Sequence, residues 1–537
     1  MTSGNARTAV RVLCVRPRLT ILTLLGILYL PWIGALPLDG TLEGNRLEAA
    51  REMLASGDWL VPRLGGAPYL AKPPFHPWSL ALCGLPAGDL SLWIGRGLSA
   101  ACTLFLCLCV HRWARRELGR RAALFAAVAL GTSVLVLEKG VRAELESELA
   151  LWTALALLLF FESGRCAERR EAVWRLLAAG LALGAAILTK GPPPLIVFAC
   201  AALTLALAAE RRRFWLAAGA AVAGLALLCF LAWVLPAGAE LGFAELLRSF
   251  RTQFTERLTQ AGRTNAEPFW FYAPALVVAL APAVLCAPVL ALVLPARVQD
   301  LRARERALFL WGWALGPCLL FSLSSGKETR YLLPVLPAWA LLLAWGWRRA
   351  RSAERLGAWR RVLVTGLARA SWIAPALWLV AGGIFFPEAR GAVLASAAAG
   401  FLAWAVLGRS LARGHARAAF LALAGLLATG KYAWAETVLA RQRRALPIAE
   451  VAATVRANLA PDEAWVLLGP YRSWWHFSVA RPCLAVADWS ALSALEPAPA
   501  RLVLAPEAAL PLADTELRTL GRWSIDGDPY RLIELAR

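Results

Sequence analysis

The sequence predicts an all-α protein that crosses a membrane many times and ends in a small α/β domain. Hydrophobic residues make up 59% of its 537 residues and charged residues only 17%. The mean hydropathy is +0.56, and apolar runs of roughly 20 residues, the length of one helical crossing, recur along most of the chain. These observations exclude a soluble enzyme and a disordered chain.

The apolar segments predict about thirteen transmembrane helices. Arginines cluster in every second connection between these segments, as at 112–121, 165–175 and 297–306. The positive-inside rule places those connections in the cytoplasm. An odd number of spans then puts the N-terminus inside and the C-terminal tail outside. The predicted spans are residues 19–37, 96–111, 121–137, 147–161, 173–188, 193–209, 214–236, 269–295, 307–324, 331–347, 362–386, 390–408 and 417–435.

The basic residues carry a second pattern. The formal net charge is +21, yet only five of the 57 basic residues are lysines. The arginines explain the surplus as a topology signal, so no nucleic acid is expected. All five lysines fall at predicted outer ends of spans, where a compact ammonium group can serve an anionic ligand. Codon bias is the alternative explanation. The lysines are Lys72, Lys139, Lys190, Lys327 and Lys431.

Two loops dominate the predicted outer side. The first, residues 38–95, contains an apolar stretch at 75–94 that prolines and a glycine interrupt. We expect this stretch to be re-entrant, because a crossing there would spoil the alternation of the arginine clusters. The other loop, residues 237–268, is a candidate lid over the binding site. A polar loop between spans can equally be a plain connection.

The tail changes character after the last span. Short apolar runs alternate there with helix-like stretches such as residues 448–459. This alternation predicts a soluble α/β domain over 437–537, following a membrane domain over 1–436. The apolar runs, which we interpret as strands, are residues 464–468, 484–487 and 501–504.

Three outer motifs combine carboxylates, cations and aromatic residues, which suits transfer chemistry on a charged, hydroxylated substrate. Residues 51–74 read REMLASGDWLVPRLGGAPYLAKPP, residues 188–192 read LTKGP, and residues 321–337 read FSLSSGKETRYLLPVLP. With these motifs and EPFWFY at 267–272, the chain resembles the GT-C glycosyltransferases that use polyprenyl-phosphate sugars. It is most similar to the bacterial aminoarabinose transferases of lipid A and to the protein O-mannosyltransferases.

The resemblance implies an enzyme in the inner membrane of a bacterium, with its active site and C-terminal domain facing the periplasm. Such an enzyme moves a sugar from a polyprenyl-phosphate donor to a hydroxyl or phosphate of a lipid A-like lipid, a glycan or a protein. The resemblance implies no required cofactor and leaves a divalent metal open. Two alternatives remain: a flippase or transporter of lipid-linked sugars, and a non-catalytic relative that binds polyprenyl phosphate. Transporters tend to carry internal repeats and midplane charges, which this sequence does not display.

The resemblance also implies that a carboxylate of the first outer loop acts as the base. The family has an Asp-Glu pair there, but this chain has Leu42 and Glu43, so the aspartate is missing. Glu43 is our first candidate. Asp39, which would require a shifted loop, is the second.

A further acidic cluster lies in the second outer loop. A family aspartate aligns there with Glu146, which stands between Glu144 and Glu148. In a helix, Glu144 and Glu148 would share a face while Glu146 would point elsewhere, so only one set would face the cavity. We therefore keep both Glu144 and Glu146 as catalytic candidates.

The remaining candidates bind the donor. Cations must stabilise the leaving phosphate, and an arginine can bind it bidentately. We expect three of the lysines to converge on one phosphate-sized site. The alternatives are a charge at a helix end for Lys190 and a membrane-interface aromatic for Tyr331. The phosphate-binding candidates are Lys72, Lys190, Lys327 and Arg330, and the substrate-binding candidates are Tyr69, Tyr331, Arg46 and Arg257.

No metal site built by the protein is expected. The sequence contains no CxxC and no HExxH, and most of its 11 cysteines lie inside apolar spans. The four histidines are scattered along the chain, at His76, His111, His415 and His476.

Overall fold

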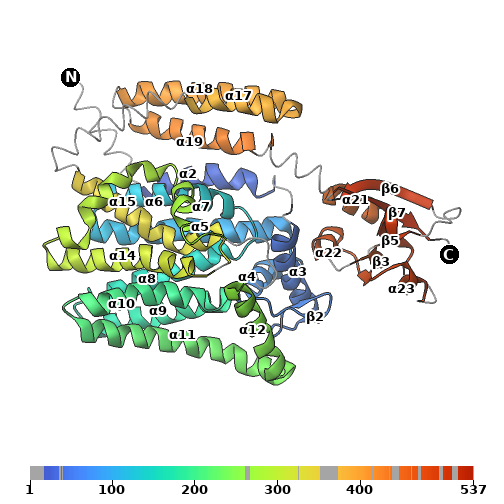
Figure 1. Ribbon diagram of the computed structural model, residues 1–537, viewed down its shortest axis with the longest axis horizontal. Coiled ribbons are helices and arrows are strands. Elements are labelled where there is room, and N and C mark those ends of the chain that lie inside the picture. The colour runs from blue at the N-terminus through green and yellow to red at the C-terminus, as the bar shows by residue number, and fades with distance from the viewer. Residues whose placement is uncertain are drawn as a thin grey trace.

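In the computed structural model, a bundle of helices carries a small mixed-sheet domain at one end (Figure 1). This arrangement confirms the predicted fold class. The structure describes residues 17–34, 38, 40–259, 267–324, 326–350, 373–412, 416–434, 436–437, 447–460, 462–469, 473–494, 500–510, 518–525 and 527–535.

The bundle is built mainly from leucine- and alanine-rich segments, which have high helix propensity. Short 3₁₀ helices containing proline interrupt it, such as η5 (Thr329–Val335). The helices are α2 (Pro17–Tyr29), α3 (Gly40–Ser56), α4 (Phe75–Gly84), α5 (Leu92–Glu117), α6 (Arg120–Gly131), α7 (Val134–Lys139), α8 (Glu146–Ser163), α9 (Arg169–Lys190), α10 (Pro193–Ala208), α11 (Arg212–Leu241), α12 (Phe243–Thr259), α13 (Tyr272–Ala279), α14 (Leu301–Ser322), α15 (Leu336–Ala350), α17 (Ile373–Phe385), α18 (Arg390–Ala412) and α19 (Ala416–Trp434).

Several helices are suited to a membrane. By length and composition, α5, α9, α11 and the segment Pro387–Leu407 can each cross one. A fifth crossing is possible if α13 and the following 3₁₀ helix, bent by 114° relative to each other, form one span. The chain is thus a multi-pass membrane protein, and the number of about thirteen spans stays a prediction.

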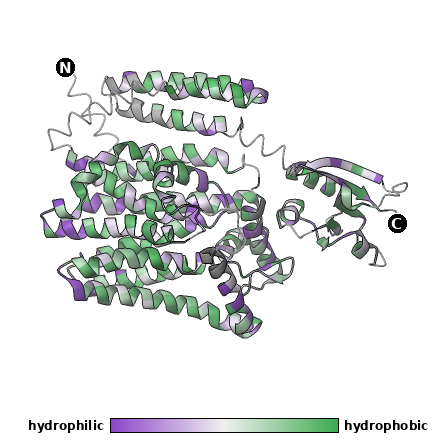
Figure 2. Cartoon of the chain, viewed as in Figure 1, coloured by the Kyte–Doolittle hydropathy of each residue, from purple (hydrophilic) through white to green (hydrophobic). Residues whose placement is uncertain are grey.

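The outer surface of the bundle is apolar, as lipid contact requires. Only 22% of the most apolar 18-residue stretch of α11 is buried inside the protein, and Leu228 on this helix is 62% exposed. Leu207 at the end of α10 is 70% exposed. Hydrophobic colour accordingly runs along the faces of the bundle helices in Figure 2. In water such a surface would drive aggregation, whereas in lipid it has no such cost.

Small residues bring the helices close together. A methyl group at Gly184 of α9 would lie 2.7 Å from the Cβ atom of Cys229 on α11. At Gly316 of α14, it would lie 2.6 Å from the Cβ atom of Cys200 on α10. Helices in lipid associate through such close packing, because burial of apolar surface between them gains little.

The C-terminal domain contains one five-stranded sheet in the order β4-β3-β5-β7-β6. The first three strands in this order are parallel, and β7 joins β5 and β6 in antiparallel pairs. The expected strands at 464–468, 484–487 and 501–504 are therefore confirmed. The elements are α21 (Ile448–Asn458), β3 (Trp465–Leu468), α22 (Ser473–Val479), β4 (Cys483–Val486), α23 (Trp489–Ser493), β5 (Leu502–Pro506), β6 (Arg518–Ile525) and β7 (Asp528–Glu534).

The first outer loop of the prediction is an ordered cap on one end of the bundle. It contains α3, a hairpin of β1 (Arg63–Leu64) and β2 (Ala67–Pro68), and α4. Ten helical residues span about 15 Å, so α4 is too short to cross a membrane. The cap also contacts the C-terminal domain, because α3 packs against α22.

The expected loop at 237–268 is largely helical instead. Helix α11 continues to Leu241, and α12 follows directly. Leu246 on α12 is buried, and it packs with Phe250 against Leu70 and Trp233. Spacings of four residues along an amphipathic helix produce this buried face. Its polar residues made the segment resemble a loop.

Candidate functional site

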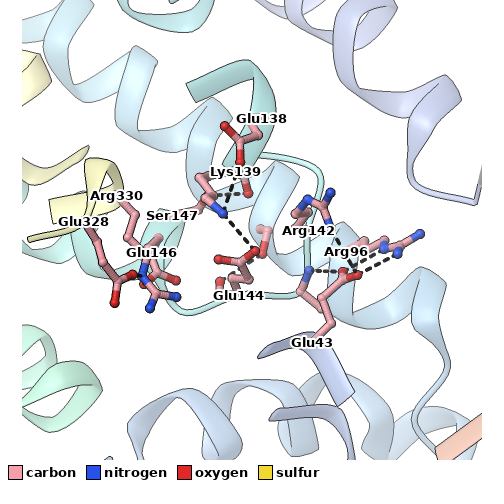
Figure 3. Close-up of polar contacts among 12 residues, drawn as sticks. Glu43, Arg96, Glu138, Lys139, Arg142, Glu144, Glu146, Ser147, Glu328 and Arg330 are labelled. Carbon is pink, nitrogen blue, oxygen red and sulfur yellow. Dashed lines mark hydrogen bonds and ion pairs between the residues drawn. The ribbon is translucent and has the colours of Figure 1, made fainter. Parts of the chain in front are cut away.

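Ionisable side chains converge at the capped end of the bundle, around the turn between α7 and α8 (Figure 3). They come from α3, α5, the end of α7, this turn, the start of α8, the end of α9 and η5. Buried charges at a membrane helix end are costly unless they are paired, and they usually mark functional positions. The site is therefore best described carboxylate by carboxylate.

Glu146 is the centre of the first group. It opens α8 and is 3% exposed. The positive end of the α8 dipole favours a carboxylate at this position. Lys190, the last residue of α9, lies 3.0 Å from Oε1 of Glu146, and Arg330 Nε lies 3.7 Å from the same oxygen. Lys190 Nζ also lies 4.9 Å from the centre of the Tyr331 ring. The structure thus brings together two predicted phosphate ligands, one predicted aromatic and one predicted carboxylate.

Glu144 is the second carboxylate. It lies in the turn before α8, which begins at Glu146, so the expectation that Glu144 and Glu148 share a helical face is wrong. Lys139 Nζ donates to Oε1 of Glu144 at 3.1 Å. Oε2 is buried, and among the described residues it has no hydrogen-bond partner. Burial and the nearby negative charge of Glu146 raise the pKa of Glu144.

Glu148 belongs to a different contact. Its oxygens accept hydrogen bonds from Ser79 at 2.5 Å and face Nδ1 of His76 at 2.7 Å, both on α4. Glu148 therefore ties α8 to the cap, whereas Glu144 and Glu146 lie close enough to perturb each other electrostatically.

Glu43, our first candidate for the base, is fully buried on α3. Arg96 donates to both of its oxygens, at 2.9 Å and 2.8 Å, and is itself fully buried. The backbone N–H of Ala143 donates to Oε1 at 2.7 Å. Glu43 thus connects α3, α5 and the loop before Glu144. Such a doubly bound carboxylate is suited to holding the site together, and its role as the base stays a prediction.

Arg46 and Tyr69 meet beside this cluster. The guanidinium of Arg46 hydrogen-bonds the Tyr69 hydroxyl, and its carbon lies 5.6 Å from the centre of the Tyr69 ring. Arg46 follows Glu43 by three residues on α3, so it projects near the same end of the helix. Both residues are substrate-binding candidates.

Two other phosphate-binding candidates bond backbone carbonyls. Lys72 donates to the carbonyl of Ala71 at 2.7 Å, and Lys327 donates to the carbonyl of Glu267 at 2.8 Å. The convergence of all three lysines on one phosphate therefore stays a prediction. Asp39 lies outside the described residues, as does the side chain of Arg257 on α12.

Two site residues were missed from the sequence. Arg96 was counted as part of an apolar span, and Lys139 was noticed as a lysine but not placed in the site. Both are charged residues next to apolar runs, and such residues in membrane segments are expected to be paired and functional. That signal would have found them.

One group of possible metal ligands occurs among the described residues. Glu48, Glu52 and His476 place one ligand atom each within 4.8 Å of one another. Each side chain also has a protein partner: Glu48 pairs with Arg51, Glu52 accepts from two backbone N–H groups, and His476 contacts Glu48. The contact between His476 and Glu48 joins the C-terminal domain to the cap. The sequence did not predict this group from the scattered histidines, because Glu48 and His476 are 428 positions apart.

The helical bundle, its cap and the buried charges at one end define a membrane protein of the GT-C fold. Sequence comparison agrees. The family model of the dolichyl-phosphate-mannose-protein mannosyltransferases matches residues 71–237.

Comparison with individual proteins indicates a more specific similarity than the family model does. An undecaprenyl phosphate-alpha-4-amino-4-deoxy-L-arabinose arabinosyl transferase of Edwardsiella ictaluri (strain 93-146) is 32% identical over 318 residues, which cover 57% of this chain and 56% of that protein. A second relative of the same description, from Sodalis glossinidius (strain morsitans), is 28% identical over 412 residues, with 73% and 71% covered. The match with the first relative thus spans little more than half of its length.

Solved structures extend the likeness over nearly the whole chain. ArnT from Cupriavidus metallidurans bound to undecaprenyl phosphate has a TM-score of 0.75 at 21% identity, with 96% of this chain and 98% of that chain covered. The oligosaccharyltransferase AglB from Archaeoglobus fulgidus, in complex with an inhibitory peptide and a dolichol-phosphate, has a TM-score of 0.52 at 12% identity, with 90% and 69% covered. The chain therefore has the ArnT fold, and in sequence it is similar to the aminoarabinose transferases.

Proposed function

We propose that the protein is a membrane glycosyltransferase that moves a sugar from a polyprenyl-phosphate donor to an acceptor hydroxyl or phosphate. The observation that carries this proposal is that Glu144, which has a buried and unpartnered oxygen, lies near Glu146 and the two cations that Glu146 binds. One group can accept a proton while the others neutralise a leaving phosphate. The fold and the sequence similarity described above support the same reaction class.

The roles follow from the charges. Attack of the acceptor oxygen on the anomeric carbon forms the new glycosidic bond and breaks the bond between that carbon and the donor phosphate oxygen. The acceptor proton passes to Oε2 of Glu144. Polyprenyl phosphate leaves with the bonding electrons, and Lys190 and Arg330 stabilise its growing negative charge. Glu146 holds these two cations in place before the donor binds.

Glu144 is better prepared than Glu43 for the base role. A base needs a free lone pair within reach of the proton and a pKa near the working pH. Glu144 has the unpartnered oxygen and the raised pKa, whereas donors occupy both oxygens of Glu43. Glu144 also lies close to the first outer loop, because the backbone N–H of Ala143, the residue before it, donates to Glu43.

The donor and acceptor are proposed from the relatives. The similar proteins are described as arabinosyl transferases that use undecaprenyl phosphate-linked 4-amino-4-deoxy-L-arabinose. We therefore take this lipid as the first donor to test and a lipid A-like lipid as the first acceptor, with glycans and proteins next. The arginine pattern supports an orientation in which the site and the domain over 437–537 face the periplasm of a bacterial inner membrane.

The test uses the full-length protein reconstituted in nanodiscs with a donor whose sugar is labelled. Transfer of label to lipid A, with release of free undecaprenyl phosphate, is the expected result. A panel of other polyprenyl-phosphate sugars and acceptors follows if this pair is inactive. Tight donor binding without transfer to any acceptor would instead indicate a non-catalytic lipid-binding protein.

A further inference from the structure

A second polar site lies far from the candidate active site. A cavity of about 340 Å³ is lined by Arg18, at the start of α2, and by four residues near the end of α5. These four are His111, Arg112, Arg115 and Arg116. Every lining side chain is basic, so the cavity presents a concentrated positive potential.

The lining groups are short of partners. Among the described residues, no carboxylate pairs with Arg18, Arg112 or Arg115, whereas Arg116 pairs with Glu162 at 3.1 Å. His111 is 1% exposed, and no described residue hydrogen-bonds its Nε2 atom. A buried polar atom without a partner is unfavourable unless a ligand or water satisfies it. The buried histidine and the exposed arginines therefore point to a ligand with negatively charged oxygens.

The cavity and the candidate active site lie at opposite ends of α5. Arg96, near the start of this helix, bonds Glu43. The cavity residues begin fifteen positions later, which corresponds to about 22 Å along a helix that is about 39 Å long. Exposed apolar side chains flank the cavity end, including Leu19 at 54% and Leu22 at 42% on α2. The cavity thus lies where lipid headgroups meet water.

We propose that this cavity binds a phosphate group at the membrane face opposite the candidate active site. Guanidinium groups match phosphate oxygens in bidentate geometry, and the imidazole adds a further donor. Basic pockets between membrane helices at such positions are suited to anionic headgroups. Its volume lies in the ~300–1,000 Å³ range of small-ligand sites, so part of a headgroup fits with the phosphate. A lipid or free inorganic phosphate can supply this chemistry.

A topology signal alone does not account for the arrangement. Arg120 and Arg121 at the start of α6 are exposed at the same end of the bundle and provide the same signal without lining the cavity. A topology signal also gives no reason for a histidine to be buried beside the arginines. Arg120 and Arg121 therefore provide a matched control for the removal of two positive charges.

The experiment uses native mass spectrometry of the full-length protein with phosphatidylglycerol, with diacylglycerol, which lacks the phosphate, and with inorganic phosphate. The double variant Arg112→Gln/Arg115→Gln is compared with Arg120→Gln/Arg121→Gln. We expect the first pair to weaken phosphatidylglycerol binding about tenfold or more and the control pair to change it less than about twofold. Both pairs are exposed, so thermal unfolding should match that of the parent protein.

The competition arm identifies the source of the phosphate. Displacement of phosphatidylglycerol by low millimolar inorganic phosphate identifies free phosphate as a ligand, and retention identifies the lipid headgroup. The proposal is overturned if both double variants lose binding equally, because binding would then reflect surface charge alone. It is also overturned if diacylglycerol binds as well as phosphatidylglycerol.

Discussion

At the scale of residues, the chemistry depends on which carboxylate keeps a free oxygen. Glu43, Glu144 and Glu146 are all buried and lie around the loop before α8. Each of them nevertheless has a different set of hydrogen-bond donors. Among these three described carboxylates, Glu144 is the one with a buried oxygen that has no hydrogen-bond partner. The sequence predicted that this cluster matters, because carboxylates at a membrane helix end are rare. It did not predict the division of roles, because that depends on Arg96, Lys139 and Lys190, which reach the cluster from three other segments.

The pH dependence of transfer tests the pairing of Glu144 with Glu146. Because burial and Glu146 raise the pKa of Glu144, the base is protonated at acidic pH and transfer should increase with pH until Glu144 is ionised. Glu146→Gln removes one negative charge, so the pKa of Glu144 falls and the acidic limb should shift to lower pH. Glu138→Gln, which alters an exposed neighbour of Lys139, should leave the limb in place. A limb that Glu146→Gln does not move would exclude this coupling.

Glu43 has a different expected phenotype. Glu43→Gln weakens the ion pair with Arg96, which is fully buried. Breaking a buried ion pair costs about 3–5 kcal/mol, so we expect lower yield and a lower unfolding temperature in detergent. Transfer per folded molecule should change much less than in a Glu144 variant. Normal stability with complete loss of transfer would show instead that Glu43 is the base.

At the scale of elements, the contact between α3 and α22 joins the cap to the C-terminal domain. Arg51 on α3 donates to the carbonyl oxygens of His476 and Phe477 at 3.0 Å and 3.2 Å, and its guanidinium lies 5.3 Å from the Phe477 ring centre. The sequence could not predict this contact, because its partners are more than 400 positions apart. It did predict β3, β4 and β5 from their apolar runs. The edge strand β6 was missed because exposed residues such as Arg518 and Arg522 interrupt it.

Arg51→Ala should loosen this contact. Each hydrogen bond of a charged group contributes about 1.5–3 kcal/mol, so amide hydrogen exchange in α22 should accelerate while the bundle helices keep their protection. Arg248→Ala is the matched control, because Arg248 pairs with Glu245 on the exposed face of α12. Equal exchange of α22 in both variants would show that Arg51 does not hold the domain.

At the scale of the whole molecule, the two ends of the bundle differ in charge chemistry. The capped end carries the buried carboxylate cluster with Lys139 and Lys190, whereas the other end carries the arginine-lined cavity. Lys431 extends the first group, since it donates to the carbonyl of Leu137, two residues before Lys139. The positions of the arginine clusters and of the lysines along the sequence predicted this separation, because arginines mark one side of the membrane. The number of spans could not be fixed in the same way, since bent and short apolar helices blur the count.

Orientation can be measured directly. Ser490→Cys, on the exposed part of α23, and Arg121→Cys, at the other end, are each introduced into a Cys83→Ser background, which removes an exposed native thiol. A membrane-impermeant maleimide added to spheroplasts should label the first variant and spare the second. Labelling of Arg121→Cys alone would reverse the proposed topology.

The central claim is sugar transfer with Glu144 as the base, and one comparison tests it most directly. Full-length parent protein, Glu144→Gln and Glu138→Gln are assayed in nanodiscs for transfer from undecaprenyl phosphate-linked aminoarabinose to lipid A. We expect Glu144→Gln to lower kcat by about 10²- to 10⁴-fold with little change in donor binding, and Glu138→Gln to stay within about threefold of the parent. Undiminished transfer by a stably folded Glu144→Gln protein would contradict the account.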